Sequence, residues 1–420
     1  MRFHAACFFI FDYLCIRISR RRLCTDDYPM AMILKENAGI PAHLLWTLAV
    51  IAGVSVANLY YNQPLLDLMR LDFGVSEFQA NLIAMITQVG YALGLLFIIP
   101  LGDLYHRKRI IEINFFVLVL SLLAIAVATD IRIVWSASLL TGICSVVPQI
   151  FIPIAAQFST PATKGRNVGL VISGLLTGIL ASRVVSGLVA DFWGWRTMYY
   201  AAAVLMVLSF LVVMRVLPDI APTFSGRYVD LMKSILSLLK KYPPLRIYAG
   251  RAGFAFGSFL SLWACLAFRM AQEPFCVGSD VVGLLGLCGV AGALSASIVG
   301  RYVKQVGVKR FNFLGCALFL ASWLLLFFAQ DTYASMIGGI LLIDIGMQCI
   351  QISNQTSMFE VAPQAANRVN TIFMTTYFIG GSVGTLLAGS AWALAQWSGV
   401  VCVGILLALA SLSVTAFTKY

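Results

Sequence analysis

The chain has 420 residues, of which 60% are hydrophobic and 11% charged, with a mean hydropathy of +0.90. A soluble globular protein carries about 25% charged residues, so composition excludes that class. The formal net charge of +11 does not indicate nucleic-acid binding, because the basic residues lie in short segments between apolar stretches.

Residues 1–40 are expected to be an N-terminal tail. A short apolar run is broken by Asp12 and followed by a basic cluster at 20–22. The run is too short to cross a bilayer, and no small-residue cleavage site of a signal peptide follows it. We expect a dispensable or non-native segment, with Met30 or Met32 as the natural start.

Twelve apolar stretches then follow, each near the roughly 20 residues that a membrane-spanning helix needs. The sequence therefore predicts an all-α membrane protein. The expected spans are 43–66, 78–101, 110–129, 133–157, 167–190, 197–217, 246–270, 280–300, 311–330, 333–358, 369–392 and 398–418. We expect an N-terminal six-helix half at 41–217, a polar and basic central loop at 218–245, and a C-terminal six-helix half at 246–420.

Basic residues are distributed unevenly between the two sides of this arrangement. If the N-terminus is cytoplasmic, 23 Lys and Arg residues lie on that side and four lie in the opposite loops. Positive charge accumulates on the cytoplasmic side of membrane proteins. Both termini are therefore predicted to be cytoplasmic, with an even number of spans.

A shift of the chain by 202 residues shows an internal repeat. It aligns Gln149 with Gln351, Pro161 with Pro363, Arg166 with Arg368, Gly178 with Gly380, Gly187 with Gly389 and Trp195 with Trp397. These residue types are uncommon or conformationally special, so chance is a poor explanation. Parallel repeats of this kind are typical of transporters whose site lies between the two halves.

Three G-x-x-x-G motifs, at 90–94, 174–178 and 380–384, predict close approaches between helices. A purely structural role is the simpler interpretation. The functional alternative is that spans 5 and 11 slide on one another.

Polar side chains within the spans are candidate site residues. Asp344, Gln348, Gln351 and Gln355 follow one another at spacings that place them on one face of a helix. A charge at the bilayer centre costs about 2.5–3.5 kcal/mol on insertion scales, so this face should meet a watery cavity or a partner. The alternative is a set of hydrogen bonds that only holds the bundle together. The other members of this group are Asn58, Tyr61, Asn62 and Gln149.

Arg183 lies deep in span 5, where it could pair with a carboxylate or with an anionic group of a substrate. Asp344 is the acid expected nearest the bilayer midplane, and it is the candidate carrier of a coupling proton. Arg183 would oppose that role if the two side chains paired.

Four segments resemble the major facilitator superfamily, and most closely its twelve-span drug:proton antiporter-like efflux branch. They are ANLYYNQPLL (57–66), PLGDLYHRKR (100–109), GRYVKQVGVKR (300–310) and DIGMQCIQISNQTSMFEVAP with NTIFMTTYFIGG (344–363 and 370–381). The resemblance covers roughly residues 40–418. It departs from the family pattern at Ile99, His106 and Lys304, and the antiporter signature of span 5 lacks its Pro and last two Gly.

The resemblance implies that spans 1, 4, 7 and 10 line a central cavity. It also implies that Asp103, beside Arg107, Lys108 and Arg109, forms a cytoplasmic gate; a solvated loop acid is the alternative. The expected activity is proton-coupled efflux of a small organic molecule, such as a drug, sugar or metabolite, by alternating access. Proton-coupled uptake and a non-transporting membrane protein remain as alternatives.

No enzyme motif is present: the chain lacks a P-loop, H-E-x-x-H and G-x-S-x-G. Ten cysteines form no C-x-x-C pair and His is scarce, so neither a metal site nor a cofactor is predicted. The expected partners are a small-molecule substrate, protons and the lipid bilayer, with no nucleic acid. We expect a monomer in the inner membrane.

Overall fold

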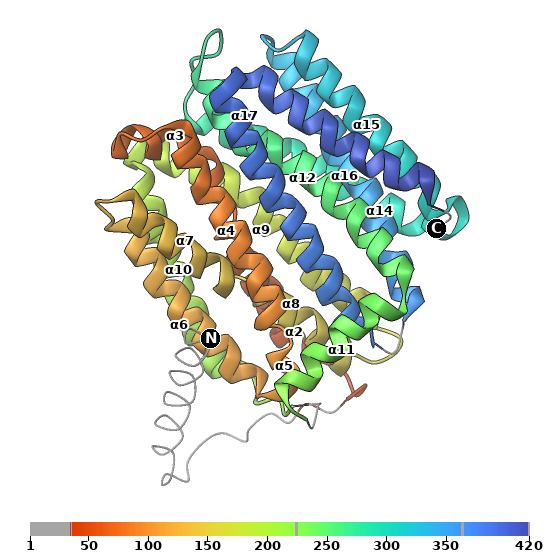
Figure 1. The fold of residues 1–420 in the computed structure, drawn as a ribbon. Coiled ribbons are helices and arrows are strands. Elements are labelled where there is room, and N and C mark those ends of the chain that lie inside the picture. Colours follow the sequence, from red (N-terminus) through yellow and green to blue (C-terminus); the bar gives the residue numbers. More distant parts are fainter. Residues whose placement is uncertain (1–33, 35, 223–225, 363–364, 419–420) are drawn as a thin grey trace. The chain divides into compact units, whose positions relative to one another are not determined.

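The computed structural model describes residues 34, 36–222, 226–362 and 365–418, and Lys35–Tyr420 form one compact unit. Most of the expected tail at 1–40, with both candidate start residues, lies outside these ranges. The described residues form helices and connecting turns (Figure 1). The helices before the central loop are α2 (Ala42–Ala57), α3 (Asn62–Phe73), α4 (Glu77–Phe97), α5 (Leu101–Leu104), α6 (Arg107–Ala126), α7 (Ile131–Cys144), α8 (Pro148–Phe158), α9 (Lys164–Trp193) and α10 (Trp195–Val216).

The remaining helices are α11 (Tyr228–Lys241), α12 (Pro243–Ala271), α13 (Ser279–Leu285), the 3₁₀ turn η1 (Gly286–Cys288), α14 (Gly289–Val306), α15 (Val308–Phe328), α16 (Tyr333–Val361) and α17 (Ala366–Phe417). Eleven helical stretches of the described chain are long and apolar enough to cross a membrane. The last of them, α17, contains non-helical backbone at Ala395 and Gln396. That break divides it near the predicted boundary, which gives the twelve spans expected.

Two close helix contacts show how the halves repeat one another. A Cβ added at Gly178 on α9 would lie 2.2 Å from the carbonyl oxygen of Gly53 on α2. A Cβ added at Gly380 on α17 would lie 2.1 Å from that of Gly253 on α12. The 202-residue shift aligns Gly178 with Gly380, so the predicted repeat is confirmed as a repeated packing contact. The suggested sliding contact between spans 5 and 11 was wrong, because α9 packs on α2 and α17 packs on α12.

The spans alternate in direction, so their connections lie on two sides. The connections at 74–76, 194 and 272–278 lie on one side, here called the α13 side, and α5 and α11 mark the other, here called the α11 side. In Figure 1, α4 from the first half lies beside α17 from the second.

On the α13 side the two halves are joined by hydrogen bonds. Asn81 Nδ2 donates to the carbonyl oxygen of Thr385 at 2.8 Å, and Ser279 Oγ donates to that of Gly187 at 3.1 Å. These contacts join α4 to α17 and α9 to α13. The halves are therefore closed against each other on the α13 side.

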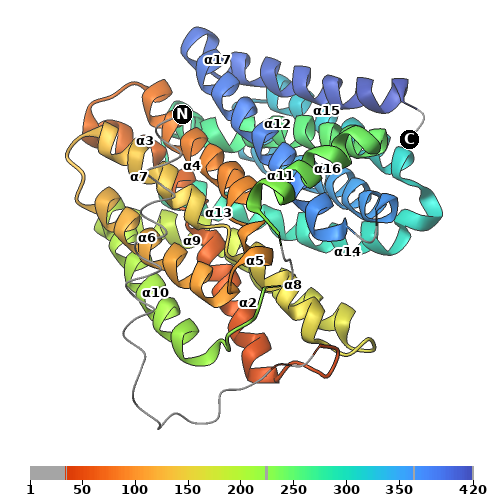
Figure 2. The same ribbon diagram turned by 60° about the horizontal axis from the view of Figure 1, so that its bottom comes forward.

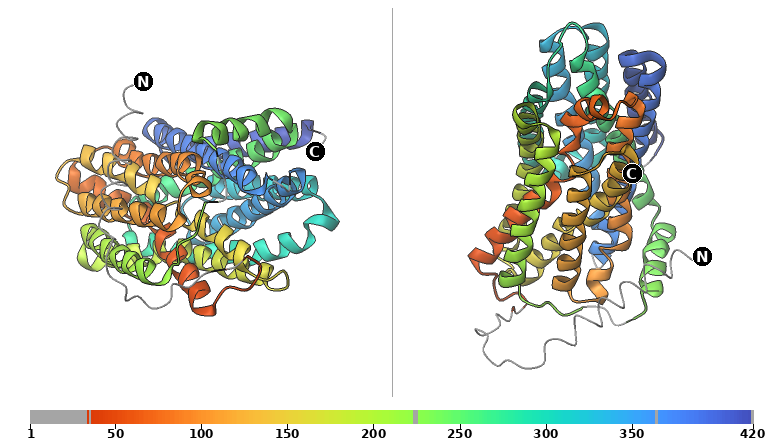
Figure 3. Two further views of the ribbon diagram at one scale, coloured as in Figure 1. Left: turned by 90° about the horizontal axis from the view of Figure 1, so that it is seen from below. Right: turned by 90° about the vertical axis from the view of Figure 1, so that its left-hand side faces the viewer.

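The central loop contains a helix that the sequence analysis treated only as a polar loop. In α11, Leu231, Ile235 and Leu238 are buried while Lys240 and Lys241 end the helix. The helix packs against α12 and α17 on the α11 side (Figures 2 and 3). Tyr228 donates a hydrogen bond to the carbonyl oxygen of Phe97 at 3.1 Å. Burial raises the pKa of Tyr228 to about 12, so its hydroxyl keeps the donated proton at neutral pH.

Candidate functional site

A cavity of about 130 Å³, here called the central cavity, lies between the two halves. Its walls come from α2, α4, α8 and α9 of the first half and from α12, α14, α16 and α17 of the second. Among the described residues that line it, Arg183 is the only basic one and Asp344 the only acidic one. Six of its lining residues are aromatic: Tyr60, Tyr91, Phe256, Phe259, Tyr377 and Phe378.

Arg183 is held in a fixed orientation on α9. Its side chain is buried, and Nε donates to Oε1 of Gln63 at 2.8 Å. The guanidinium carbon lies 3.9 Å from the ring centroid of Trp263 and 5.2 Å from that of Tyr60. An arginine is attracted to an aromatic face at these distances. The Trp263 face and the Gln63 hydrogen bond therefore fix the plane and one edge of the guanidinium.

Asp344 lies in the interior of α16 with only 6% of its surface exposed. Its Oδ2 atom is buried and has no hydrogen-bond partner among the described residues. Gly289 and Gly292 of α14 face it: a Cβ added at Gly292 would lie 3.2 Å from the Cβ of Asp344. Burying an acid without a full set of hydrogen-bond partners lowers the stability of the fold. Its presence therefore favours a functional role for Asp344 over a purely structural one.

The polar face predicted for span 10 enters the cavity in part. Gln348 and Gln351 line the cavity with Asp344, and Gln351 Oε1 accepts a hydrogen bond from Tyr377 at 3.0 Å. Gln355 lies outside the cavity lining, where its Nε2 donates to Asn370 Oδ1 at 3.0 Å.

The predicted residues of span 1 lie elsewhere. Asn58 Nδ2 donates to carbonyl oxygens of its own helix, and Asn62 Nδ2 donates to Thr87 Oγ1 at 3.2 Å. Tyr61 is buried but does not line the central cavity. Val56 and Tyr60 are the residues of this span that line the cavity, and sequence reasoning missed both.

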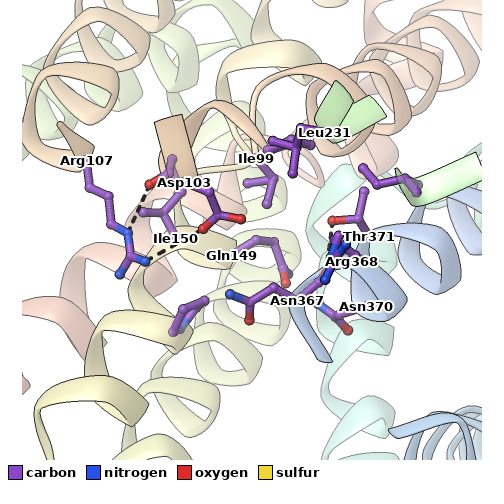
Figure 4. Close-up of a pocket in the computed structure, with 14 residues that line it drawn as sticks. Ile99, Asp103, Arg107, Gln149, Ile150, Leu231, Asn367, Arg368, Asn370 and Thr371 are labelled. Atoms are coloured by element: carbon purple, nitrogen blue, oxygen red, sulfur yellow. Dashed lines mark hydrogen bonds and ion pairs between the residues drawn. The ribbon is translucent and has the colours of Figure 1, made fainter. Parts of the chain in front are cut away.

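A second pocket, of about 40 Å³, opens on the α11 side and is here called the α11-side pocket (Figure 4). Gln149 of α8 lines both this pocket and the central cavity, and its Nε2 donates to the Tyr91 hydroxyl at 3.4 Å. The apolar face of α11 contributes Leu231 and Ile235 to the same pocket. The 366–371 segment contributes polar residues that were not predicted: Asn367, Arg368, Asn370 and Thr371.

Asp103 and Arg107, two of the predicted gate residues, line the α11-side pocket together. Arg107 Nη2 lies 3.8 Å from Asp103 Oδ1, and Arg107 Nε donates to the carbonyl oxygen of Gly102 at 3.2 Å. Arg107 Nη1 also reaches Oε1 of Gln157 at 2.9 Å.

The other two predicted gate residues lie apart from this pair. Lys108 Nζ donates to the carbonyl oxygen of Met214 at 2.8 Å, and Arg109 is exposed. In the part of the chain that the structure describes, no group of three or more His, Cys, Asp or Glu side chains could hold a metal ion.

The family model of the Major Facilitator Superfamily matches residues 46–385. The chain is 38% identical over 380 residues, 90% of its length and 96% of the relative's, to the "Uncharacterized transporter YgaY" of Escherichia coli O157:H7. It is 30% identical to the "Probable transporter SCO4007" of Streptomyces coelicolor, over 88% of this chain and 86% of that protein.

Two solved structures share the fold at low sequence identity. A bacterial homolog of the human lysosomal transporter Spinster, in an inward-facing conformation, gives a TM-score of 0.72 at 12% identity over 90% of this chain and 95% of that chain. The nucleoside transporter NupG gives 0.70 at 14% identity over 89% of this chain and 98% of that chain.

Proposed function

We propose that this chain exports a small organic molecule in exchange for protons. The premise is that the chain belongs to the major facilitator superfamily and is a membrane transporter. The observation that carries this proposal is the central cavity, where the buried Oδ2 of Asp344 has no hydrogen-bond partner among the described residues and the cation Arg183 lines the same cavity. A site between repeated halves is where transporters built from repeats bind their substrates.

The arrangement of the halves supports alternating access. They are closed against each other on the α13 side, and the α11-side pocket approaches the central cavity from the other side through the shared residue Gln149. The excess of basic residues on the α11 side supports a cytoplasmic location for it, with both termini cytoplasmic. We therefore propose an inward-facing state of a monomer in the inner membrane.

Asp344 is the residue we propose to exchange protons. The titratable groups that interact with it are the cation Arg183 from α9 and the neutral side chains of Cys288 from η1 and Tyr377 from α17. No ion pair joins Arg183 to Asp344 within 4.0 Å in the described chain, so the Asp344 carboxylate can bind another partner. Asp344 can therefore hold either a proton or a donor group of the substrate, which is the competition that an antiporter requires.

Asp103 and Arg107 are proposed to form the gate on the cytoplasmic side. Their contact lies at the rim of the α11-side pocket, where the halves must separate and close as the transporter changes state. A charge pair that forms in one state and breaks in the other shifts the balance between the two states.

Inside-out membrane vesicles test the proposed function. Respiration acidifies the vesicle interior, and a quenched dye reports the gradient. A panel of drugs, sugars and metabolites is added to vesicles from a strain stripped of its own pumps. With the wild-type protein, an exported compound should enter the vesicles in exchange for protons, and the dye fluorescence should recover. With Asp344→Asn the fluorescence should stay quenched. Compound movement without proton movement would refute the exchange, a reversed dependence on the gradient would indicate uptake, and no movement of any compound would indicate a non-transporting protein.

A further inference from the structure

The central cavity contains one cation and one acid that do not neutralise each other by direct contact. Arg183 and Asp344 both line it, and no ion pair within 4.0 Å joins them in the part of the chain described. Their buried charges would be stabilised by a ligand that offers an opposite charge to each. This reasoning rests on the proposed transport function and concerns which class of substrate is transported.

Arg183 presents the edge of its guanidinium that binds carboxylates. Trp263 covers one face at 3.9 Å, and Nε is occupied by Gln63. The Nη1 and Nη2 atoms make no hydrogen bond to any described residue, and they form the fork that binds a carboxylate with two parallel hydrogen bonds. The packing of Trp263 thus prepares Arg183 to receive an anion.

Asp344 presents the complementary acceptor. Its buried Oδ2 atom has no hydrogen-bond partner in the described part of the chain, although a carboxylate readily accepts hydrogen bonds from ammonium groups. The lining residues offer no second cation to satisfy it. A positively charged donor on the ligand would supply the missing partner.

The two side chains lie against successive turns of the same helical segment. A Cβ added at Gly286 would lie 3.0 Å from the Cβ of Arg183, and one added at Gly289 would lie 3.6 Å from Oδ1 of Asp344. Positions three residues apart on a helix are about 5–6 Å apart. Arg183 and Asp344 therefore border the same short stretch of η1 and α14, and both line the central cavity, so one small ligand can contact both side chains.

The remaining wall of the cavity is aromatic and apolar. Phe256 and Tyr377 stack with ring centroids 3.7 Å apart, and Phe378 meets Tyr91 at 4.4 Å. Such rings favour a flat apolar group. A cavity of about 130 Å³ is close to the roughly 150 Å³ of an engineered apolar cavity that binds benzene, so it has room for about one aromatic ring.

We propose that the central cavity binds an aromatic zwitterion of the amino-acid class, with its carboxylate on Arg183, its ammonium on Asp344 and its ring among the cavity aromatics. The ammonium group and a proton then compete for Asp344. That competition explains how export of the zwitterion can be exchanged for protons.

Three probes that share one ring test this proposal on the purified full-length protein in lipid nanodiscs. L-phenylalanine carries both charges, 3-phenylpropanoate lacks the ammonium and phenethylamine lacks the carboxylate. Binding is measured by titration calorimetry at pH 7. L-phenylalanine should bind at least about tenfold more tightly than either single-charge probe, because each charged hydrogen bond contributes separately.

Variants then identify the residue that binds each charged group of the ligand. Arg183→Gln should remove the preference for L-phenylalanine over phenethylamine, and Asp344→Asn should remove its preference over 3-phenylpropanoate. The matched controls are Arg132→Gln and Asp191→Asn, which alter exposed residues outside the cavity and should bind like the wild type. A melting temperature close to that of the wild type shows that each variant is folded.

Two results would overturn the proposal: equal binding of 3-phenylpropanoate and L-phenylalanine, or no binding of L-phenylalanine. If the vesicle assay still showed proton exchange driven by another compound, the transport function would stand and only the substrate class would fail.

Discussion

The close contact between α2 and α9 makes a sharp prediction about Gly178. A Cβ there would lie 2.2 Å from the carbonyl oxygen of Gly53, whereas ordinary contacts are 3.4 Å or longer. Gly178→Ala therefore requires the two helices to separate by about 1 Å, and overpacking of this kind costs about 1–3 kcal/mol.

Gly169→Ala is the matched control on the same helix. A Cβ at Gly169 meets nothing within 4 Å, so alanine adds helix propensity without a clash. The apparent melting temperature of purified protein, measured by loss of the monodisperse peak after heating, should fall for Gly178→Ala and hold or rise for Gly169→Ala. Equal melting temperatures for the two variants would refute the packing argument.

Four further predictions concern the repeat, the gate, the topology and the α11 helix. Gly380→Ala should lower the melting temperature of the protein as Gly178→Ala does, because a Cβ at Gly380 would lie 2.1 Å from the carbonyl oxygen of Gly253; an unchanged melting temperature would contradict this. Asp103→Asn should leave membrane abundance unchanged, since the buried Arg107 keeps its hydrogen bonds to Gly102 and Gln157, yet it should sharply reduce transport; normal transport would remove the gate role. A reporter that fluoresces only in the cytoplasm should give signal when it is fused after Arg227 and when it is fused after Tyr420; absence of signal at either point would overturn the topology. Tyr228→Phe removes the hydroxyl bonded to Phe97, so hydrogen exchange of α11 should accelerate, with unchanged exchange counting against that anchor.

The spans could be predicted because each depends on local composition, and the repeat because uncommon residues recur 202 positions apart. The division of α17 was predicted near Gln396, where apolar stretches end on both sides. The helix within the central loop was missed because its apolar face is narrow and lies between polar residues. Burial of Leu231 and Ile235 depends on contacts with distant helices.

The candidate site was predictable only where a helix is uninterrupted. Asp344, Gln348 and Gln351 share a face because α16 is continuous across them. In span 1 the chain turns between α2 and α3, so helical spacing no longer indicates which side chain enters the cavity, and Tyr60 was missed. The contact of Arg183 with Gln63 and Trp263 joins three distant segments, which spacing along one chain cannot indicate.

The most direct test of the central claim is transport by Asp344→Asn in proteoliposomes at saturating substrate, with Asp191→Asn as the control. Asparagine keeps the shape and hydrogen bonding of Asp344 but cannot exchange a proton. An imposed pH gradient should no longer drive transport by Asp344→Asn, while substrate exchange at equal pH should persist. Transport by Asp344→Asn that still follows the pH gradient would contradict the claim.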